Sequence, residues 1–123
     1  MARKILIVDD EPNIVKVLES RLKSQGYDII IAGDGQTGLE AFQKYKPDLV
    51  ILDVMLPKKD GYQVCRELKS TPTGENTPVV MLTAKGEVED MQSGLEKGAD
   101  VYITKPFDSE SLIGIVKGLL QGD

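Results

Sequence analysis

Residues 4–12 read Lys4-Ile5-Leu6-Ile7-Val8-Asp9-Asp10-Glu11-Pro12, an apolar run that stops at three consecutive acidic residues. Consecutive large apolar residues indicate a strand that is buried on both faces, as at the centre of a parallel sheet. Proline is tolerated in the first turn of a helix, and carboxylates are favoured at a helix N-terminus. This stretch therefore predicts a β-strand, a short turn and a helix, in that order.

The same alternation continues along the chain. Strand-like runs lie near residues 4–9, 27–32, 48–53, 78–83 and 101–104, and helical patterns lie near 12–25, 36–46, 60–70, 86–97 and 108–120. Short connections between alternating strands and helices imply right-handed crossovers and a parallel sheet that is covered on both faces. We expect one doubly wound α/β sandwich with strand order 2-1-3-4-5 and five helices. It would form a single domain over residues 1–123, with its core at about 3–120 and no output domain.

The composition excludes several classes of function. The net charge of −5 argues against direct nucleic-acid binding, and no apolar run has membrane-spanning length. Cys65 is the single cysteine, which rules out an internal disulfide and favours a reducing, cytoplasmic location. The chain has no histidine, so a Ser-His-Asp triad and a zinc-binding helix are excluded, and any phosphohistidine must come from a partner.

Charged and polar residues stand at the carboxyl ends of four of the apolar runs. Asp9 and Asp10 follow the first run, Asp53 ends the third, and Lys105 follows the fifth. Thr83 ends the fourth run. In order 2-1-3-4-5 these residues share the carboxyl rim of the sheet, beside the crevice between strands one and three. We expect one site that holds both a cation and an anion.

Magnesium is the cation that this rim suits, because Mg²⁺ prefers oxygen ligands and retains water. Asp10 and Asp53 can bind it directly, Asp9 through water, and the Met55 backbone carbonyl can complete the set. Helix capping by residues 9–12 is the competing interpretation of the acidic run. A carboxylate beside Mg²⁺ can attack phosphorus, with Lys105 and Thr83 compensating the charge; Asp53 is the best candidate nucleophile.

The chain resembles the receiver domain of two-component response regulators over about residues 3–120. The matching motifs are Ile7-Val8-Asp9-Asp10-Glu11, Leu52-Asp53-Val54-Met55-Leu56-Pro57 with Asp60-Gly61, Met81-Leu82-Thr83-Ala84 and Lys105-Pro106-Phe107. The resemblance implies a flavodoxin-like fold and a phosphoryl group accepted by Asp53 from a histidine kinase. It implies that Mg²⁺ is bound by Asp9, Asp10, Asp53 and the Met55 carbonyl.

The resemblance also implies a switch and two partner surfaces. Thr83 would turn toward the phosphoryl group on Asp53 while Tyr102 moves inward, and the Lys105–Pro106 bond would be cis. A sensor histidine kinase would contact Ile14, Val17, Pro106 and Phe107. A downstream protein target would bind the face formed by the fourth helix, the fifth strand and the fifth helix.

Other interpretations remain open. The chain can be a phosphorelay intermediate rather than an output regulator. A Mg²⁺-dependent phosphohydrolase with an aspartyl-phosphate intermediate is a further class, but Met55 stands where such enzymes place a second acid; we therefore expect no separate substrate turnover. A flavodoxin-like cofactor binder is a third class, but this sequence lacks the Ser/Thr-rich phosphate loop that such a protein needs after its first strand.

Residues 33–38 spell GxGxxG, the pattern of a dinucleotide-binding turn. Asp34 would place a negative charge in the pyrophosphate site, so a glycine-rich turn is the better interpretation.

Overall fold

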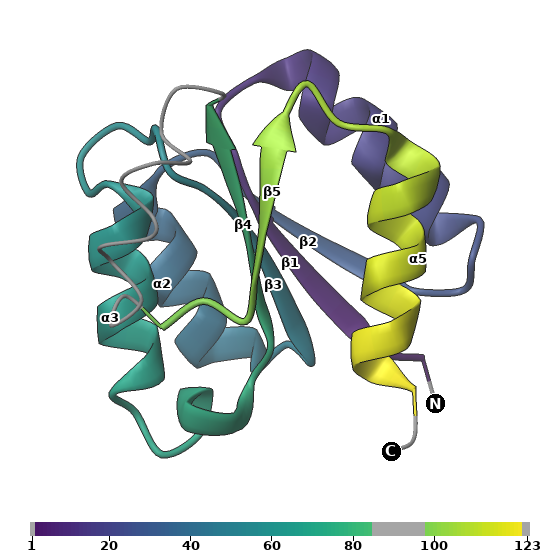
Figure 1. Ribbon diagram of the computed structural model, residues 1–123. Coiled ribbons are helices and arrows are strands. Elements are labelled where there is room, and N and C mark those ends of the chain that lie inside the picture. Colours follow the sequence, from purple (N-terminus) through teal and green to yellow (C-terminus); the bar gives the residue numbers. More distant parts are fainter. Residues whose placement is uncertain (1, 85–97, 122–123) are drawn as a thin grey trace.

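The computed structural model describes residues 2–84 and 98–121 (Figure 1). Its elements in chain order are β1 (Lys4–Val8), α1 (Pro12–Lys23), β2 (Asp28–Ala32), α2 (Gly35–Tyr45), β3 (Leu49–Asp53), α3 (Gly61–Lys69), the short 3₁₀ helix η1 (Gly74–Asn76), β4 (Val79–Ala84), β5 (Val101–Lys105) and α5 (Ser109–Leu120). The helix predicted over residues 86–97 lies outside the described residues.

The five strands form one parallel sheet in the order β2-β1-β3-β4-β5. This order confirms the predicted doubly wound topology. The strand ends differ from the predicted ones by single residues: for example, β1 ends at Val8, β4 continues one residue beyond Thr83, and Lys105 is the last residue of β5 rather than the residue after it. The chain enters the sheet at β1, so the crevice between β1 and β3 is the point where the winding reverses.

Alternate residues of the central strands face opposite layers. One face packs against α1 and α5, and the other packs against α2 and α3 (Figure 1). Ile5 and Ile7 of β1 belong to the first layer, whereas Leu6 and Val8 belong to the second. Burial on both faces explains why the β1 run is continuously apolar.

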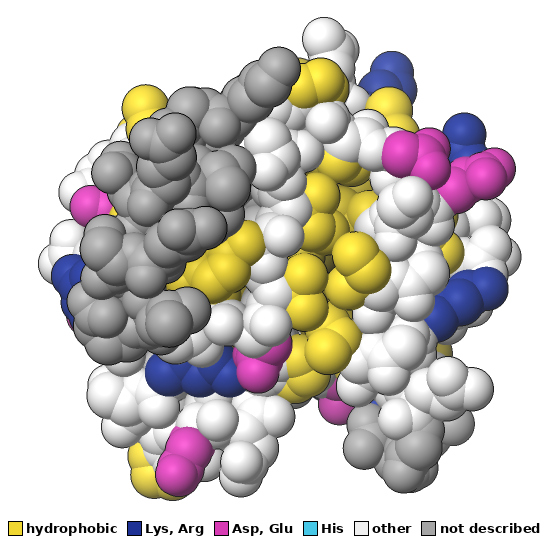
Figure 2. All heavy atoms as spheres, in the orientation of Figure 1, with side chains coloured by type: hydrophobic (Ala, Val, Ile, Leu, Met, Phe, Trp, Pro, Cys, Tyr) yellow, Lys and Arg dark blue, Asp and Glu magenta, His cyan; other side chains and the backbone are white. Residues whose placement is uncertain are grey.

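The two edge strands are less buried than the central ones. Ile31 of β2 is 41% exposed, and all five residues of β5 are partly exposed. Figure 2 shows hydrophobic side chains gathered along the middle of the molecule, where β5 lies in the view of Figure 1. The apolar runs therefore predicted the strands β2 and β5 correctly. They did not predict how exposed these strands are, because exposure depends on whether a strand lies at the edge or the centre of the sheet.

Cys65 lies in the layer between the sheet and helices α2 and α3, where it is fully buried. Burial raises the pKa of its thiol to about 11. Because the thiolate is the reactive form, this buried cysteine is an apolar packing residue.

The segment Gly33–Gly38 is a turn and a helix start rather than a nucleotide cradle. Asp34 caps α2, and its Oδ1 accepts a hydrogen bond from the Thr37 N–H at 2.8 Å. A Cβ at Gly35 would overlap the backbone oxygen of Lys59, and one at Gly38 would lie 2.9 Å from a Val8 methyl group. These glycines allow close packing, which confirms the glycine-rich-turn interpretation.

Gly61 brings the start of α3 against the end of β3. A Cβ at this position would overlap the carbonyl oxygen of Asp53 and lie 2.8 Å from the Cα of Val54. Both atoms are backbone, so they cannot rotate away. We therefore expect Gly61→Ala to lower the free energy of unfolding by about 1–3 kcal/mol, measured by urea denaturation.

Gly114 in α5 provides the matched control, because a Cβ there would meet no atom within 4 Å. Gly114→Ala is expected to raise the free energy of unfolding by about 0.5–1 kcal/mol, since alanine loses less backbone entropy in a helix. Equal effects of the two substitutions would contradict the packing argument for Gly61.

Candidate functional site

The carboxyl ends of the strands bring the predicted site residues to one rim. Asp53 ends β3 opposite Leu82, and Lys105 ends β5 opposite the last residue of β4. Asp9 follows β1 directly, and its N–H still bonds to the Ala32 carbonyl of β2 at 3.1 Å. Parallel register alone therefore collects side chains that are up to 96 positions apart in the sequence (105 − 9).

Three carboxylates lie together at this rim. Asp9, Asp10 and Asp53 each offer an oxygen, and these three atoms lie within 4.8 Å of one another. Asp9 and Asp53 are buried, with 2% and 3% of their surface exposed, while Asp10 is exposed. Local backbone donors fix the two buried groups: Glu11 N–H bonds to Asp9 Oδ1 at 2.9 Å, and Met55 N–H bonds to Asp53 Oδ1 at 3.1 Å.

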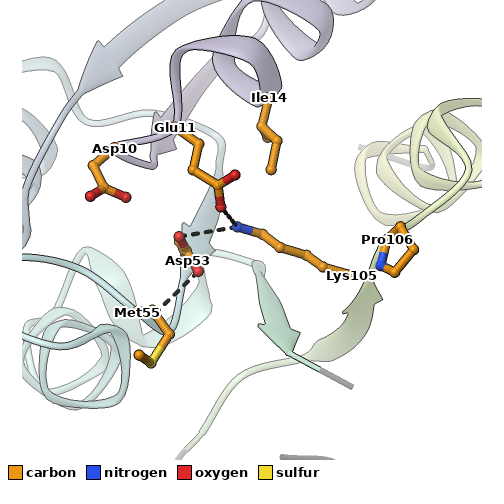
Figure 3. Close-up of a pocket in the computed structure, with 7 residues that line it drawn as sticks. All are labelled: Asp10, Glu11, Ile14, Asp53, Met55, Lys105 and Pro106. Carbon is orange, nitrogen blue, oxygen red and sulfur yellow. Dashed lines mark hydrogen bonds and ion pairs between the residues drawn. The ribbon is translucent and has the colours of Figure 1, made fainter. Parts of the chain in front are cut away.

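Lys105 places its ammonium group among these carboxylates (Figure 3). Its Nζ lies 3.1 Å from Asp53 Oδ2 and 3.4 Å from Asp9 Oδ2. The third partner is Glu11, whose Oε1 is 2.9 Å from the same nitrogen. The Lys105–Pro106 peptide bond that follows is cis, as predicted.

The protonation equilibria of these groups reflect their burial. Burial raises the pKa of Asp53, although Lys105 and the Met55 N–H act in the opposite direction. Burial also raises the pKa of Asp9, against the effect of the Glu11 N–H. Burial alone would lower the pKa of Lys105, but its hydrogen bonds to Glu11 and Asp53 and the charges around it raise the pKa overall. The carboxylates of this cluster outnumber its single ammonium group, so a further cation would be favourable.

The donor set fits a divalent cation. Hard carboxylate oxygens suit Mg²⁺, which takes one or two carboxylates directly and keeps several waters, so a third carboxylate can act through water. Apart from its ion pair with Lys105 at 3.4 Å, Asp9 Oδ2 is a buried oxygen with no hydrogen-bond partner among the described residues, so it has bonding capacity to offer. The Met55 backbone lies in the site through its N–H, but the role predicted for its carbonyl stays a prediction.

The cluster opens into a pocket of about 640 Å³ (Figure 3). Asp53 and Lys105 lie on its wall, and the exposed side chain of Met55 lies at its side; the complete lining among the described residues is Asp10, Glu11, Ile14, Asp53, Met55, Lys105 and Pro106. A small anionic group can therefore reach the Asp53 carboxylate from solvent.

The two predicted switch residues lie on the neighbouring strands β4 and β5. Thr83 is fully buried, and its Oγ1 has no hydrogen-bond partner within the described part of the chain. Tyr102 pairs with Met81 across β4 and β5 and is partly buried against the layer that contains α2 and α3. Neither residue is among the described residues that line the pocket, and the switch role predicted for them stays a prediction.

The four residues predicted to contact a kinase lie side by side. A second pocket of about 330 Å³ is lined by Asn13, Ile14, Val17, Lys105, Pro106, Phe107 and Ser109. Val17 is 47% exposed, whereas Ile14 and Phe107 are partly buried against the core. Val17 therefore faces solvent, whereas Ile14 contacts both the core and the pocket.

Glu11 is the site residue that the sequence interpretation missed. Glutamate at the N-cap position of α1 suggests a local role, yet its side chain makes no capping hydrogen bond. The side chain instead reaches Lys105, 94 positions away. The only sequence signal was a third acid next to the pair Asp9-Asp10, and nothing local shows which of three acids a distant lysine will meet.

Fold and site together define a doubly wound α/β domain with an acidic pocket at its topological switch point, where three carboxylates could hold a cation. Residues 5–117 match the family described as the response regulator receiver domain, and the chain belongs to that family of two-component signalling domains. The predicted family resemblance is thereby confirmed.

Known relatives agree with this assignment. The probable transcriptional regulator ycf27 of Cyanophora paradoxa is 48% identical over 119 residues, which are 97% of this chain and 48% of that protein. The chain thus spans about half the length of the curated relatives that it matches.

Solved structures show the same fold. Chemotaxis response regulator CheY4 of Vibrio cholerae is 31% identical with a TM-score of 0.90, and the match covers 98% of this chain and 100% of that one. The receiver domain of sensor histidine kinase PA1611 from Pseudomonas aeruginosa PAO1 was solved with a magnesium ion coordinated in its active site cleft. It is 30% identical with a TM-score of 0.87, and 97% and 98% of the two chains are covered.

None of the helices within residues 2–84 and 98–121 has the length and apolar character that a bilayer crossing requires.

Proposed function

We propose that this receiver accepts a phosphoryl group on Asp53 from the phosphohistidine of a sensor histidine kinase, with Mg²⁺ as cofactor. The observation that carries the proposal is the geometry around Asp53. A buried carboxylate ends β3 with Asp9 and Asp10 beside it and the Lys105 ammonium 3.1 Å from its Oδ2, at the wall of a pocket that solvent can enter.

The proposed reaction is a direct displacement at phosphorus. A carboxylate oxygen of Asp53 forms the new P–O bond, while the P–N bond of the phosphohistidine breaks and its electron pair stays on the imidazole nitrogen. Because the transition state is loose, positioning and charge compensation provide most of the catalysis. Asp9, Asp10 and Asp53 would hold Mg²⁺, which compensates the negative charge on the phosphoryl oxygens.

Lys105 and Thr83 have separate proposed roles. Lys105 already lies beside Asp53 and can donate to a phosphoryl oxygen without crossing the pocket. Thr83 has a buried hydroxyl that lacks a partner among the described residues, so a phosphoryl oxygen on Asp53 would offer it a hydrogen bond. Movement of Thr83 toward the phosphoryl group would leave space that Tyr102 can fill.

Phosphorylation by a small-molecule donor tests this function without a kinase. Purified chain is incubated with acetyl phosphate and Mg²⁺, and its intact mass is recorded over time. We expect a mass gain of one phosphoryl group that disappears when EDTA is added first, and peptide mapping that places it on Asp53. A gain that does not depend on metal, or that maps elsewhere, would contradict the proposal.

The pocket beside α1 is the proposed kinase surface. Its apolar wall is formed by Val17, Ile14 and Phe107, and it adjoins the Asp53 pocket through Ile14 and Pro106. A helix bundle that presents a phosphohistidine needs such an apolar contact next to the acceptor. The downstream target is proposed to bind the partly exposed β5 and the neighbouring α5; the helix predicted between β4 and β5 lies outside the described residues.

Truncation of Val17 tests this surface. We expect Val17→Ala, alone and combined with Ile14→Ala, to slow phosphotransfer from the kinase that phosphorylates the chain fastest by roughly five- to thirtyfold, the usual range for an interface anchor. The rate with acetyl phosphate should not change for Val17→Ala. Ile31→Ala is the matched control, because Ile31 is 41% exposed on the edge strand β2. Wild-type phosphotransfer in the Val17 variant would contradict the assignment.

Turnover of a separate substrate is not part of the proposal. The side chain two positions after Asp53 is Met55, which is 66% exposed and has no proton to give a leaving group. Signalling then proceeds by protein contact, either to an output partner or to the next member of a phosphorelay. The net charge of −5 argues against direct DNA contact by these residues, although the relatives of twice this length are named transcriptional regulators.

A further inference from the structure

Glu11 differs from the N-cap residues of the other α-helices that the structure describes. Asp34, Asp60 and Asp108 each occupy an N-cap position and accept a hydrogen bond from the backbone of their own helix. Glu11 occupies the same position at α1 but makes no such bond. Its carboxylate extends instead across the mouth of the pocket to Lys105 (Figure 3). The side chain therefore stabilises something other than its helix.

The contact with Glu11 uses the Lys105 ammonium group, which is the group proposed to bind a phosphoryl oxygen during transfer. Among the described residues Lys105 has three anionic neighbours. The Glu11 oxygen at 2.9 Å is closer to the Lys105 nitrogen than the oxygens of Asp53 and Asp9, at 3.1 and 3.4 Å. Asp53 and Asp9 hold the lysine from the buried side. The Glu11 side chain is 56% exposed and lines the pocket through which a donor arrives.

We propose that Glu11 is a brake on the phosphorylation of Asp53, which selects against strongly anionic phosphodonors by holding Lys105 and by repelling the incoming phosphoryl group. The inference rests on the function proposed above and names a residue that controls its rate. An incoming phosphoryl oxygen must take a place on Lys105 while Glu11 still faces it. Two anions then compete for one cation.

Removal of the Glu11 charge is expected to increase the rate of Asp53 phosphorylation without changing the position of Lys105. Asp53 and Asp9 are almost fully buried and remain in contact with the lysine. The exposed ion pair is weak, so the buried Asp53 and Asp9 fix the position of the Lys105 side chain, while Glu11 only occupies one side of its ammonium group. Repulsion of a donor anion, in contrast, acts each time a donor enters the pocket.

The test compares Glu11→Gln with wild-type chain and with Glu19→Gln. Glu19 lies on α1 and pairs with Lys23 at 3.1 Å, so its substitution changes the net charge equally. Phosphorylation rates are measured by intact mass at saturating Mg²⁺, with acetyl phosphate and with phosphoramidate, which carries less net negative charge at neutral pH. Urea unfolding midpoints verify that the variants are folded.

We expect Glu11→Gln to react roughly threefold faster than wild type with acetyl phosphate, the factor that follows from an exposed charge interaction. The gain should be smaller with phosphoramidate and should shrink at high ionic strength, because salt screens exposed charges. Glu19→Gln should match wild type. A purely structural role for Glu11 would not produce a donor- and salt-dependent difference.

The two proposals fail in different ways. If wild-type chain gains no phosphoryl group from either donor, the proposed function itself is wrong. If wild-type chain is phosphorylated but Glu11→Gln reacts at the same rate or more slowly with both donors, Glu11 is no brake. A uniform decrease would show that Glu11 positions Lys105 productively, which would also overturn the inference.

Discussion

Asp53→Asn is expected to abolish phosphorylation by acetyl phosphate, with no gain in intact mass after any incubation that saturates wild-type chain. Asparagine has nearly the same shape as aspartate, and its side-chain oxygen can still accept the hydrogen bond from Met55 N–H. The amide oxygen is a far weaker nucleophile than a carboxylate, however, and it carries no charge to attract the metal. The fold should remain while the reaction is lost.

Asp28→Asn provides the matched control. Asp28 is exposed at the opposite end of the sheet, where it begins β2, and its substitution removes one negative charge without touching the site. This variant should gain mass at the wild-type rate. Phosphorylation of Asp53→Asn at a wild-type rate would show that the acceptor is another residue and would remove the central element of the proposal.

Metal addition gives an independent measurement on the same variant. Burial raises the pKa of Asp53, which means that its ionised form is disfavoured in the folded chain when no metal is present. Mg²⁺ binds the folded state and should raise the melting temperature of wild-type chain. The increase should be smaller for Asp53→Asn because one ligand carboxylate is lost.

Lys105→Met is the second substitution with a large expected effect. It preserves an unbranched side chain of similar length but removes the ammonium group that lies 3.1 Å from Asp53. A fixed positive group aimed at developing charge typically contributes a factor of about 100 or more to the rate. We expect phosphorylation by acetyl phosphate to slow by roughly this factor, measured by intact mass at saturating Mg²⁺.

The same substitution should affect metal binding in the opposite direction. Lys105 competes with any cation for Asp9 and Asp53, so its loss should tighten Mg²⁺ binding in a calorimetric titration. Lys117→Met, at an exposed position of α5, should leave both the rate and the affinity unchanged. Weaker Mg²⁺ binding in Lys105→Met would mean that the lysine organises the carboxylates rather than competing for them.

Local sequence patterns determined most of the fold. The β1 run is apolar from Ile5 to Val8 because a central parallel strand is buried on both faces, and this pattern is readable without a structure. Pro12 begins α1 as predicted, and the apolar runs end at the residues that later meet at the rim. The pattern could not predict that Ile31 would be 41% exposed, because its burial depends on whether β2 is a central or an edge strand.

The sequence by itself determined that the acids and the lysine at the strand ends reach the site, whereas only the tertiary structure decided how they pair and that Glu11 joins them. Asp9, Asp53 and Lys105 could be placed together because parallel strands carry their last residues to a common edge. The partner of Glu11 could not be predicted, because an acid at this position can cap the following helix or pair with a cation far away in the sequence. The choice depends on the position of the Lys105 ammonium, which the packing of β5 beside β4 fixes in three dimensions.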